Sequence, residues 1–137
     1  MTPTYLDLSG LTELDVWLDA NVSQLYKDEP LAQDWARVSK IIEETGEAIA
    51  ELIGFTGQNP RKGHSGSPDA MLNEIADVVI TGILGIQHFT KYDGATIELI
   101  RKRWEYRLEA ADQASHSGMA PLFPNTYNPL FNDKPES

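Results

Sequence analysis

The sequence predicts an all-α protein: a four-helix, bundle-like fold followed by an extended, proline-rich C-terminal arm. Apolar residues recur at intervals of three and four along most of the chain, and no segment alternates apolar and polar residues as a half-buried strand does. The composition changes after residue 117, which predicts the arm. The 137 residues therefore divide into one helical domain over 1–117 and an arm over 118–137.

Each predicted helix has its own boundary signals. The first covers about 11–28 and has an apolar stripe from Leu11 to Leu25. Pro30 suits the first turn of a second helix, which runs to about Phe55. Glycine and proline are concentrated in 54–68, which predicts a loop. The remaining elements are a third helix over about 69–91, a turn at 92–94 and a fourth helix to about 115.

The C-terminal arm combines two features that a solvated tail does not share. Four prolines in the last twenty residues exclude a long helix. Its apolar residues, which include Phe123, Leu130 and Phe131, favour burial. We expect the arm to lie over its own domain or over a neighbouring subunit.

Composition excludes several classes of partner. The chain has 21 acidic and 11 basic residues, a formal charge of −10, which disfavours binding to nucleic acid or to anionic lipid. It has no cysteine, no apolar run of membrane-spanning length and no signal-peptide pattern at its N-terminus. A cytoplasmic location is the expectation.

Acidic residues gather on one side of the second predicted helix. Glu43, Glu44, Glu47 and Glu51 fall within about 100° of one another, opposite the apolar face. Like charges four residues apart destabilise an open helix by about 0.2–0.5 kcal/mol per pair. Lys40 lies on the same side and relieves part of this repulsion. By itself this pattern also fits a solvated face.

The third predicted helix carries Glu74 and Asp77 in a narrow polar strip on an otherwise apolar helix. So apolar a helix is expected to be largely buried, with both carboxylates facing the inside of a bundle. Buried carboxylates need a partner, and a cation is one. The pairs Glu44/Glu47 and Glu74/Asp77 would form an all-oxygen site, which suits Mg²⁺ or Mn²⁺.

Two segments together resemble a known family. The run Glu43-Glu44-Thr45-Gly46-Glu47, followed after 26 residues by Glu74-Ile75-Ala76-Asp77, is similar to the E-E-x-x-E and E-x-x-D signature of the MazG-like all-α nucleoside triphosphate pyrophosphohydrolases. The loop over 57–63 also looks like one found in a MazG-like subgroup. The resemblance covers about 11–115 and leaves the arm unexplained.

The resemblance implies a Mg²⁺-dependent hydrolase that cleaves a nucleoside triphosphate to monophosphate and pyrophosphate. Metal binding would fall to Glu44, Glu47, Glu74 and Asp77, while Glu43 would orient or deprotonate water beside Glu44 and Glu47. The phosphates would be contacted by Lys102 and Arg103 in the fourth helix, or by Arg61 and Lys62 in the loop. The alternative for the fourth-helix cluster is a solvated face with ion pairs to Glu98, Glu105 or Glu109. Family members usually form homodimers or homotetramers.

Other functions remain alternatives at this point. A non-catalytic acidic helical interaction protein predicts acids spread over an outer surface. Within the same superfamily, a phosphoribosyl-ATP pyrophosphatase or a dUTP/dCTP-specific relative also fits. A di-iron bundle needs Glu-x-x-His pairs, which the sequence lacks at these positions, and the loop lacks the spacing of a Walker phosphate-binding motif.

Overall fold

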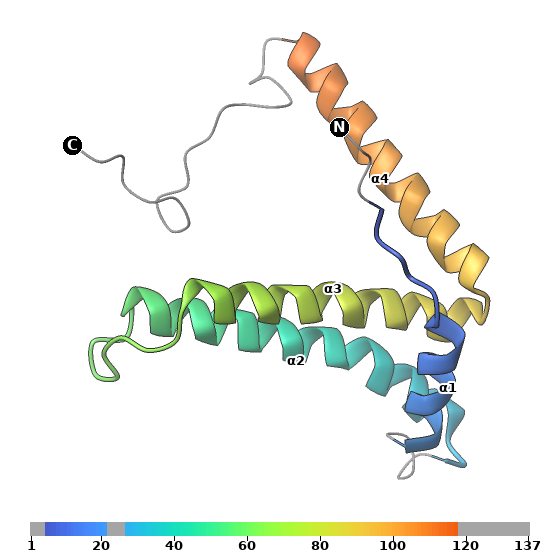
Figure 1. Ribbon diagram of the computed structural model, residues 1–137, viewed down its shortest axis with the longest axis horizontal. Coiled ribbons are helices and arrows are strands. Elements are labelled where there is room, and N and C mark those ends of the chain that lie inside the picture. The colour runs from blue at the N-terminus through green and yellow to red at the C-terminus, as the bar shows by residue number, and fades with distance from the viewer. Residues whose placement is uncertain (1–4, 22–26, 118–137) are drawn as a thin grey trace. The chain divides into compact units, whose positions relative to one another are not determined.

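The computed structural model describes residues 5–21 and 27–117, and within these ranges α-helices are the only regular secondary structure (Figure 1). The helices are α1 (Leu11–Asn21), α2 (Pro30–Thr56), α3 (Pro68–Thr90) and α4 (Asp93–His116). The predicted fold class of four helices is confirmed. The chain divides into two compact units, Met1–Thr96 and Ile97–Ser137. The predicted arm, 118–137, lies outside the described residues.

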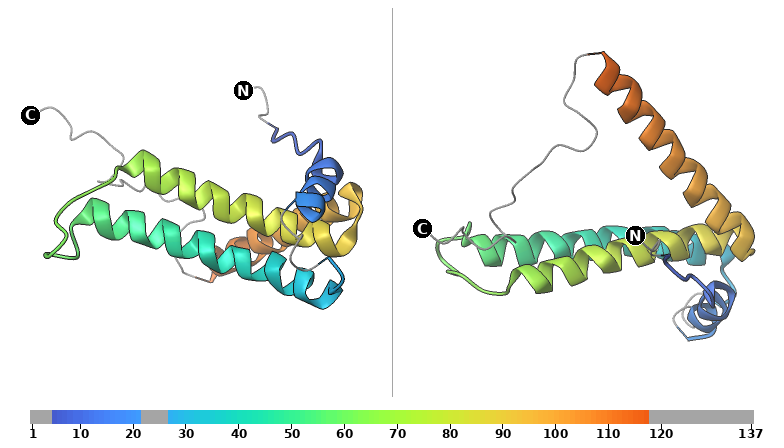
Figure 2. Two further views of the ribbon diagram at one scale, coloured as in Figure 1. Left: turned by 90° about the horizontal axis from the view of Figure 1, so that it is seen from below. Right: turned by 45° about the horizontal axis from the view of Figure 1, so that its top comes forward.

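Helices α2 and α3 form a long antiparallel hairpin, seen from three directions in Figures 1 and 2. α2 begins with Pro30, and the missing N–H of proline breaks no hydrogen bond there, because N–H groups in the first turn have no acceptor within the helix. Its last residue is Thr56, and Gly57 caps the end of the helix. Gly57 adopts a left-handed conformation (φ 65°) and donates its backbone N–H to the Gly54 carbonyl over 3.2 Å. Ser67 caps α3 by accepting a hydrogen bond from the Ala70 N–H over 3.1 Å. These caps fix both ends of the connecting loop.

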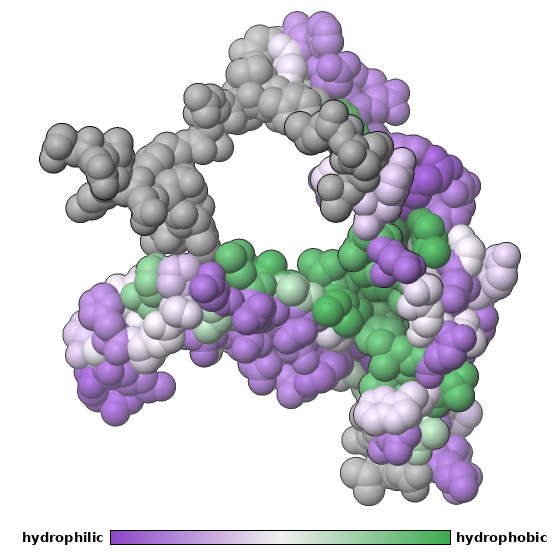
Figure 3. Space-filling view, viewed as in Figure 1, coloured by the Kyte–Doolittle hydropathy of each residue, from purple (hydrophilic) through white to green (hydrophobic). Residues whose placement is uncertain are grey.

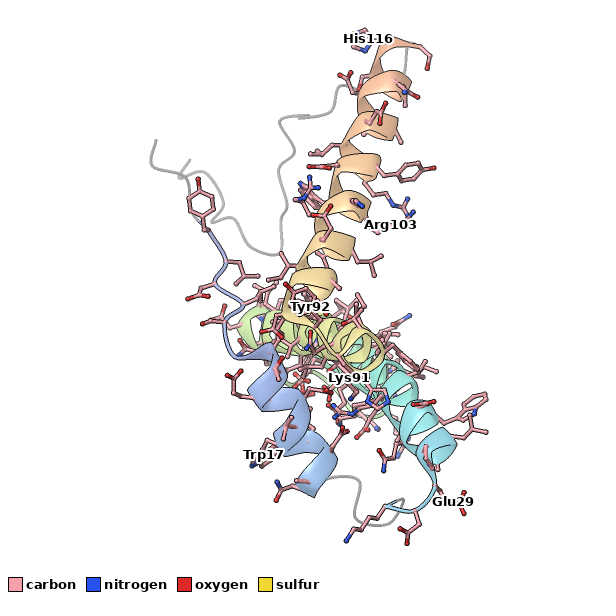
Figure 4. All side chains as sticks on the ribbon, turned by 90° about the vertical axis from the view of Figure 1, so that its right-hand side faces the viewer. Trp17, Glu29, Lys91, Tyr92, Arg103 and His116 are labelled. Atoms are coloured by element: carbon pink, nitrogen blue, oxygen red, sulfur yellow. The ribbon has the colours of Figure 1, made fainter. Side chains whose placement is uncertain are left out.

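Helix α1 covers Leu11–Asn21, and residues 22–26 of the predicted helix lie outside the described residues. Lys27 and Asp28, which the predicted helix included, form a turn, so the predicted end at residue 28 is wrong. The Asn21 side chain donates a hydrogen bond to the Trp17 carbonyl over 2.8 Å. In Figure 4 the labelled Trp17 points away from the hairpin.

A buried polar junction joins the end of α3 to the start of α4 and to α1. Gln87 and Thr96 are both fully buried, and the Thr96 hydroxyl donates to Gln87 Oε1 over 2.6 Å. Gln87 Nε2 donates to Asp93 Oδ1 over 2.9 Å, and the Thr12 hydroxyl donates to the same oxygen over 2.6 Å. The turn predicted at 92–94 is therefore shorter, because Lys91 (φ 56°) ends α3 and Asp93 already begins α4.

The buried apolar core is small. Among the described residues only Leu11 and Met71 are apolar and buried. The expectation that α3 would be largely buried is wrong for this chain alone, since Leu72, Ile75 and Val79 are 43–54% exposed. The reason is geometric: α2 covers one side of α3, and α1 covers only part of another. None of the described helices has the length and apolar composition that a bilayer span needs.

Candidate metal centre

Helices α2 and α3 bring three of the predicted carboxylates together. One oxygen from each of Glu44, Glu74 and Asp77 lies within 4.8 Å of the other two. Glu44 is buried and Glu74 is half-buried. Asp77 is exposed, which corrects the expectation that both α3 acids face the inside of a bundle. Asp77 lies about 60° further around α3 than Glu74, at the rim of the helix–helix contact.

Glu47 lies beside this triad and shares its field. The charge of Glu44 raises the pKa of Glu47, and partial loss of hydration and the charge of Glu74 add to the effect. Glu47 itself is exposed. Its place among the metal ligands stays a prediction, and the electrostatic coupling shows that it belongs to the same acidic cluster.

Lys40 is the counter-charge of the cluster, as the sequence predicts. Its ammonium nitrogen lies 2.8 Å from Glu44 Oε1 and 3.0 Å from Glu43 Oε1. The hydrogen bonds to Glu44 and then Glu43 raise the pKa of Lys40. One ammonium cannot neutralise the five carboxylates of the cluster, defined as Glu43, Glu44, Glu47, Glu74 and Asp77. The cluster therefore keeps a net negative charge that attracts a divalent cation.

The donor set fits a hard divalent cation. Carboxylate oxygens are the ligands that Mg²⁺ and Mn²⁺ prefer, with Mg–O distances of about 2.1 Å. Two ligands on opposite sides of such an ion lie about 4.2 Å apart. The spacing of up to 4.8 Å among Glu44, Glu74 and Asp77 thus needs only small side-chain rotations. The exposed rim at Asp77 leaves room for water or for a phosphate oxygen.

The loop cations predicted to contact phosphate are free to do so. Arg61 and Lys62 are exposed in the loop between α2 and α3, and neither forms an ion pair within the described part of the chain. With 1.5 Å per helical residue, the helix ends that flank the loop lie about 9 Å from Glu74 and about 14 Å from Glu47. The contact with phosphate stays a prediction.

The α4 cations belong to the second unit and make local contacts there. Lys102 Nζ lies 3.4 Å from Glu98 Oε1, and the Arg103 guanidinium lies 5.0 Å from the centre of the Tyr106 ring. Arg101 pairs with Glu98 and with Glu105, and its hydrogen bond lowers the pKa of Glu98 to about 2. The ion pairs with Glu98 and Glu105 are those of the solvated-face alternative. A phosphate-binding role for Lys102 and Arg103 stays a prediction.

A second group of potential metal ligands was not foreseen: Asp15 and Asp19 on α1 with His88 on α3. Basic side chains of the protein itself already form ion pairs with the two aspartates of this group. Arg37 Nη2 lies 2.7 Å from Asp19 Oδ1 and 3.1 Å from Asp15 Oδ1, and Lys91 Nζ lies 2.8 Å from Asp15 Oδ2. Figure 4 shows Lys91 where α3 ends, close to α1.

This second group is best explained as the attachment of α1 to the hairpin. His88 is buried and donates from Nε2 to Asp34 Oδ1 over 2.7 Å, which ties α3 to α2. Asp15 and Asp19 lie four residues apart and so share one face of α1. That spacing was the signal in the sequence, but the partners on α2 and α3 could not be read from it.

No protein-family model, no curated protein and no solved structure matches this chain.

Proposed function

We propose that this protein is a Mg²⁺-dependent nucleoside triphosphate pyrophosphohydrolase of the MazG-like type. The observation that carries the proposal is the meeting of Glu44, Glu74 and Asp77, from two antiparallel helices, within 4.8 Å. These residues come from both halves of the sequence signature, which are separated by 26 residues. If α2 and α3 did not pack against each other, the acidic residues of the two halves would lie far apart and could not share a cation.

In this proposal Glu44, Glu74 and Asp77 hold the cation, with Glu47 beside them. A Mg²⁺ ion bound there supplies charge neutralisation for the phosphate oxygens of the substrate. The raised pKa of Glu47 supports this arrangement, since it reflects repulsion among carboxylates that a cation relieves. Lys40 holds Glu43 and Glu44 in place from the N-terminal side of the cluster.

The reaction needs a positioned water and a proton acceptor. Glu43, which is exposed, orients the water and accepts its proton. The water oxygen bonds to the α-phosphorus, the bond from that phosphorus to the bridging oxygen breaks, and pyrophosphate leaves. Arg61 and Lys62 in the loop offset the charge of the β- and γ-phosphates, or Lys102 and Arg103 of α4 do so instead. The reaction requires little covalent work by the protein.

The acidic interaction protein is the second candidate, and the burial of Glu44 weighs against it. Glu44 is only 8% exposed. A surface that mimics the charge of nucleic acid must present its carboxylates to the partner. Lys40 offsets part of the cost of burying Glu44, because its ammonium nitrogen lies 2.8 Å from Glu44 Oε1. The meeting of Glu44 with Glu74 and Asp77 leaves a net negative charge that a divalent cation would offset, which favours the hydrolase.

The test is product analysis with a panel of NTPs and dNTPs, including dUTP and dCTP, and phosphoribosyl-ATP, each with Mg²⁺. We expect monophosphate and pyrophosphate from at least one substrate. The variants Glu44→Gln and Asp77→Asn should lower the rate by at least about 100-fold, because each removes a charged ligand. The panel also separates the general hydrolase from its more specific relatives.

The matched control is Glu13→Gln, the same chemical change at an exposed position in the first turn of α1. It should leave the rate within about twofold. Release of orthophosphate would show a different reaction. Intact substrates across the panel, together with no Mg²⁺ binding by calorimetry, would exclude the hydrolase.

A further inference from the structure

Lys40 is the one basic side chain, within the described part of the chain, that forms ion pairs with the acidic cluster. Its ammonium nitrogen lies between Glu44 Oε1 (2.8 Å) and Glu43 Oε1 (3.0 Å). In the proposed reaction these two carboxylates have different tasks, since Glu44 holds the metal ion and Glu43 accepts the proton of the attacking water. Lys40 therefore lies between the metal ligand and the base, where the reacting phosphorus has to be placed.

The other basic residues of the first unit have different surroundings. The side chain of Arg37 is 11% exposed and pairs with the two aspartates of α1, and Lys91 pairs with the same two aspartates. Lys27 and the basic pair at 61–62 are exposed and lie outside the helices. Lys40 is consequently the cation of this unit that is best placed to meet a phosphate group bound at the cluster.

Lys40 lies on the open side of the cluster. Around α2 it is about 40° from Glu44 and about 20° from the exposed Glu47. On α3, Asp77 is rotated from Glu74 in the same sense as Lys40 is from Glu44, by about 60°. Because the helices are antiparallel, equal senses of rotation lead to one common face, so Lys40 shares the accessible side of the cluster with the exposed Asp77. Figure 3 shows hydrophilic residues over α2 on the side toward the viewer.

The ion pair between Lys40 and Glu44 is weakened when a divalent cation binds the same carboxylate. The Glu44 side chain is only 11% exposed, so water screens the charges around it poorly. Lys40 would there lie next to a doubly charged ion, and the two positive charges repel each other. The Lys40 side chain has a flexible four-carbon stem and is 47% exposed, so it can turn away without a change in the helix. Its ammonium group is then available to another acceptor.

We propose that Lys40 is a further catalytic residue, which exchanges its bond to Glu44 for a contact with the α-phosphate of the nucleotide; this inference rests on the proposed function. In the metal-free chain Lys40 neutralises part of the charge of the cluster. In the loaded enzyme its ammonium group donates a hydrogen bond to a non-bridging oxygen of the α-phosphate, on which it acts as a point charge.

The contact assists the reaction through charge. As the water oxygen bonds to the α-phosphorus, negative charge is spread over the non-bridging phosphoryl oxygens, and a positive group held beside them stabilises the transition state. Lys40 keeps its proton throughout, so the proton of the water still passes to Glu43. The ion pair with Glu43 also keeps the ammonium group close to the attacking water.

The test is whether loss of the ammonium group changes two affinities in opposite directions. Lys40→Met removes the charge and keeps an unbranched side chain that favours the helix. In calorimetric titration with Mg²⁺ alone, its dissociation constant should be at least about fivefold lower than that of the wild type, because no ammonium group competes for Glu44. The second titration uses non-hydrolysable α,β-methylene analogues of ATP, GTP, CTP and UTP at saturating Mg²⁺. The analogue that the wild type binds most tightly should bind the variant at least about tenfold more weakly.

Three further variants separate the charge of Lys40 from its packing. Lys27→Met removes an exposed lysine from the turn before α2 and should change neither dissociation constant by more than about twofold. Lys40→Arg keeps a positive charge and should bind the analogue at least about threefold more tightly than Lys40→Met does. If circular dichroism shows that Lys40→Met does not fold, Lys40→Gln takes its place and should give the same two shifts.

Two results would overturn the role of Lys40. Tighter Mg²⁺ binding with unchanged binding of the analogue would make Lys40 a structural counter-charge only. Unchanged or weaker Mg²⁺ binding would show that Lys40 does not compete with the cation for Glu44.

The titrations measure binding without turnover, so their outcome is distinct from that of the product analysis. A protein that hydrolyses a nucleotide and shows neither shift would keep the proposed reaction and exclude Lys40 from it. A protein that shows both shifts and hydrolyses nothing would exclude the reaction and keep the contact between Lys40 and phosphate. A wild type that binds no Mg²⁺ would contradict both proposals.

Discussion

At the residue scale, the charge on Glu47 opposes folding in the absence of a cation. Its pKa is raised above the ordinary value of 4.5, chiefly by the charge of Glu44. Between 4.5 and the raised value, the folded chain binds more protons than the unfolded chain. The free energy of unfolding therefore falls as the pH rises through that window, and the loss persists above it.

We accordingly expect Glu47→Gln to stabilise the metal-free protein at pH 7. The substitution removes one like charge next to Glu44 and Glu74, and the melting temperature should rise by about 1 °C. With saturating Mg²⁺ the gain should disappear, because the wild-type cluster is then neutralised. Calorimetric melting with EDTA and with Mg²⁺ measures both effects.

Glu13→Gln serves as the control for this melting experiment, because Glu13 is exposed on α1 and outside the cluster. It should melt like the wild type in both buffers. A wild-type protein whose melting temperature does not respond to Mg²⁺ would count against a metal site at the cluster.

At the scale of elements, α1 is attached to the hairpin by polar contacts. Arg37 of α2 bonds to Asp15 and Asp19, and it also donates to the Asp15 backbone carbonyl over 3.0 Å. Asp15 is 3% exposed. Burial alone would raise the pKa of Asp19, but hydrogen bonds from Arg37 and Lys91 outweigh it and lower the value. A buried carboxylate that loses its cation is strongly destabilising.

We expect Arg37→Met to weaken the attachment of α1 by about 1.5–3 kcal/mol, since the buried Asp15 would keep Lys91 as its only cationic partner of the two. Hydrogen exchange of the α1 amides measures this directly. The control is Arg101→Met, which removes ion pairs with Glu98 and Glu105 on the exposed surface of α4. That change should cost no more than about 1 kcal/mol. Equal effects of the two substitutions would mean that the buried network does not hold α1.

The elements show how far local signals determine structure. α2 and α3 begin and end within about two residues of the predicted limits, because proline, glycine and serine fix their caps. The predicted end of α1 at residue 28 is wrong, since Lys27 and Asp28 form a turn, and residues 22–26 lie outside the described part of the chain. Lys91 and Asp93 likewise shorten the predicted turn before α4.

At the scale of the whole molecule, apolar residues of α2 and α3 such as Ile42 and Val79 are exposed in the single chain, which keeps the predicted homo-oligomer an expectation. If two hairpins share one bundle, the folded state is favoured by mass action. The melting temperature of the wild type should then rise by about 2 °C for each tenfold increase in protein concentration. Scanning calorimetry from low to high micromolar concentration tests this expectation. Val79→Lys should melt at a lower temperature that does not change with concentration.

The sequence by itself determined the helical class, the limits of α2 and α3 with the loop between them, and which acidic residues were candidates for one cluster. Apolar periodicity and capping residues act locally, so they can be recognised in the sequence alone. The tertiary structure alone decided that Glu44, Glu74 and Asp77 meet, that Asp77 is exposed, that α1 is held by Arg37 and Lys91, and that apolar residues of α2 and α3 stay exposed. These properties depend on which residues from distant segments pack together, and no local pattern encodes that choice.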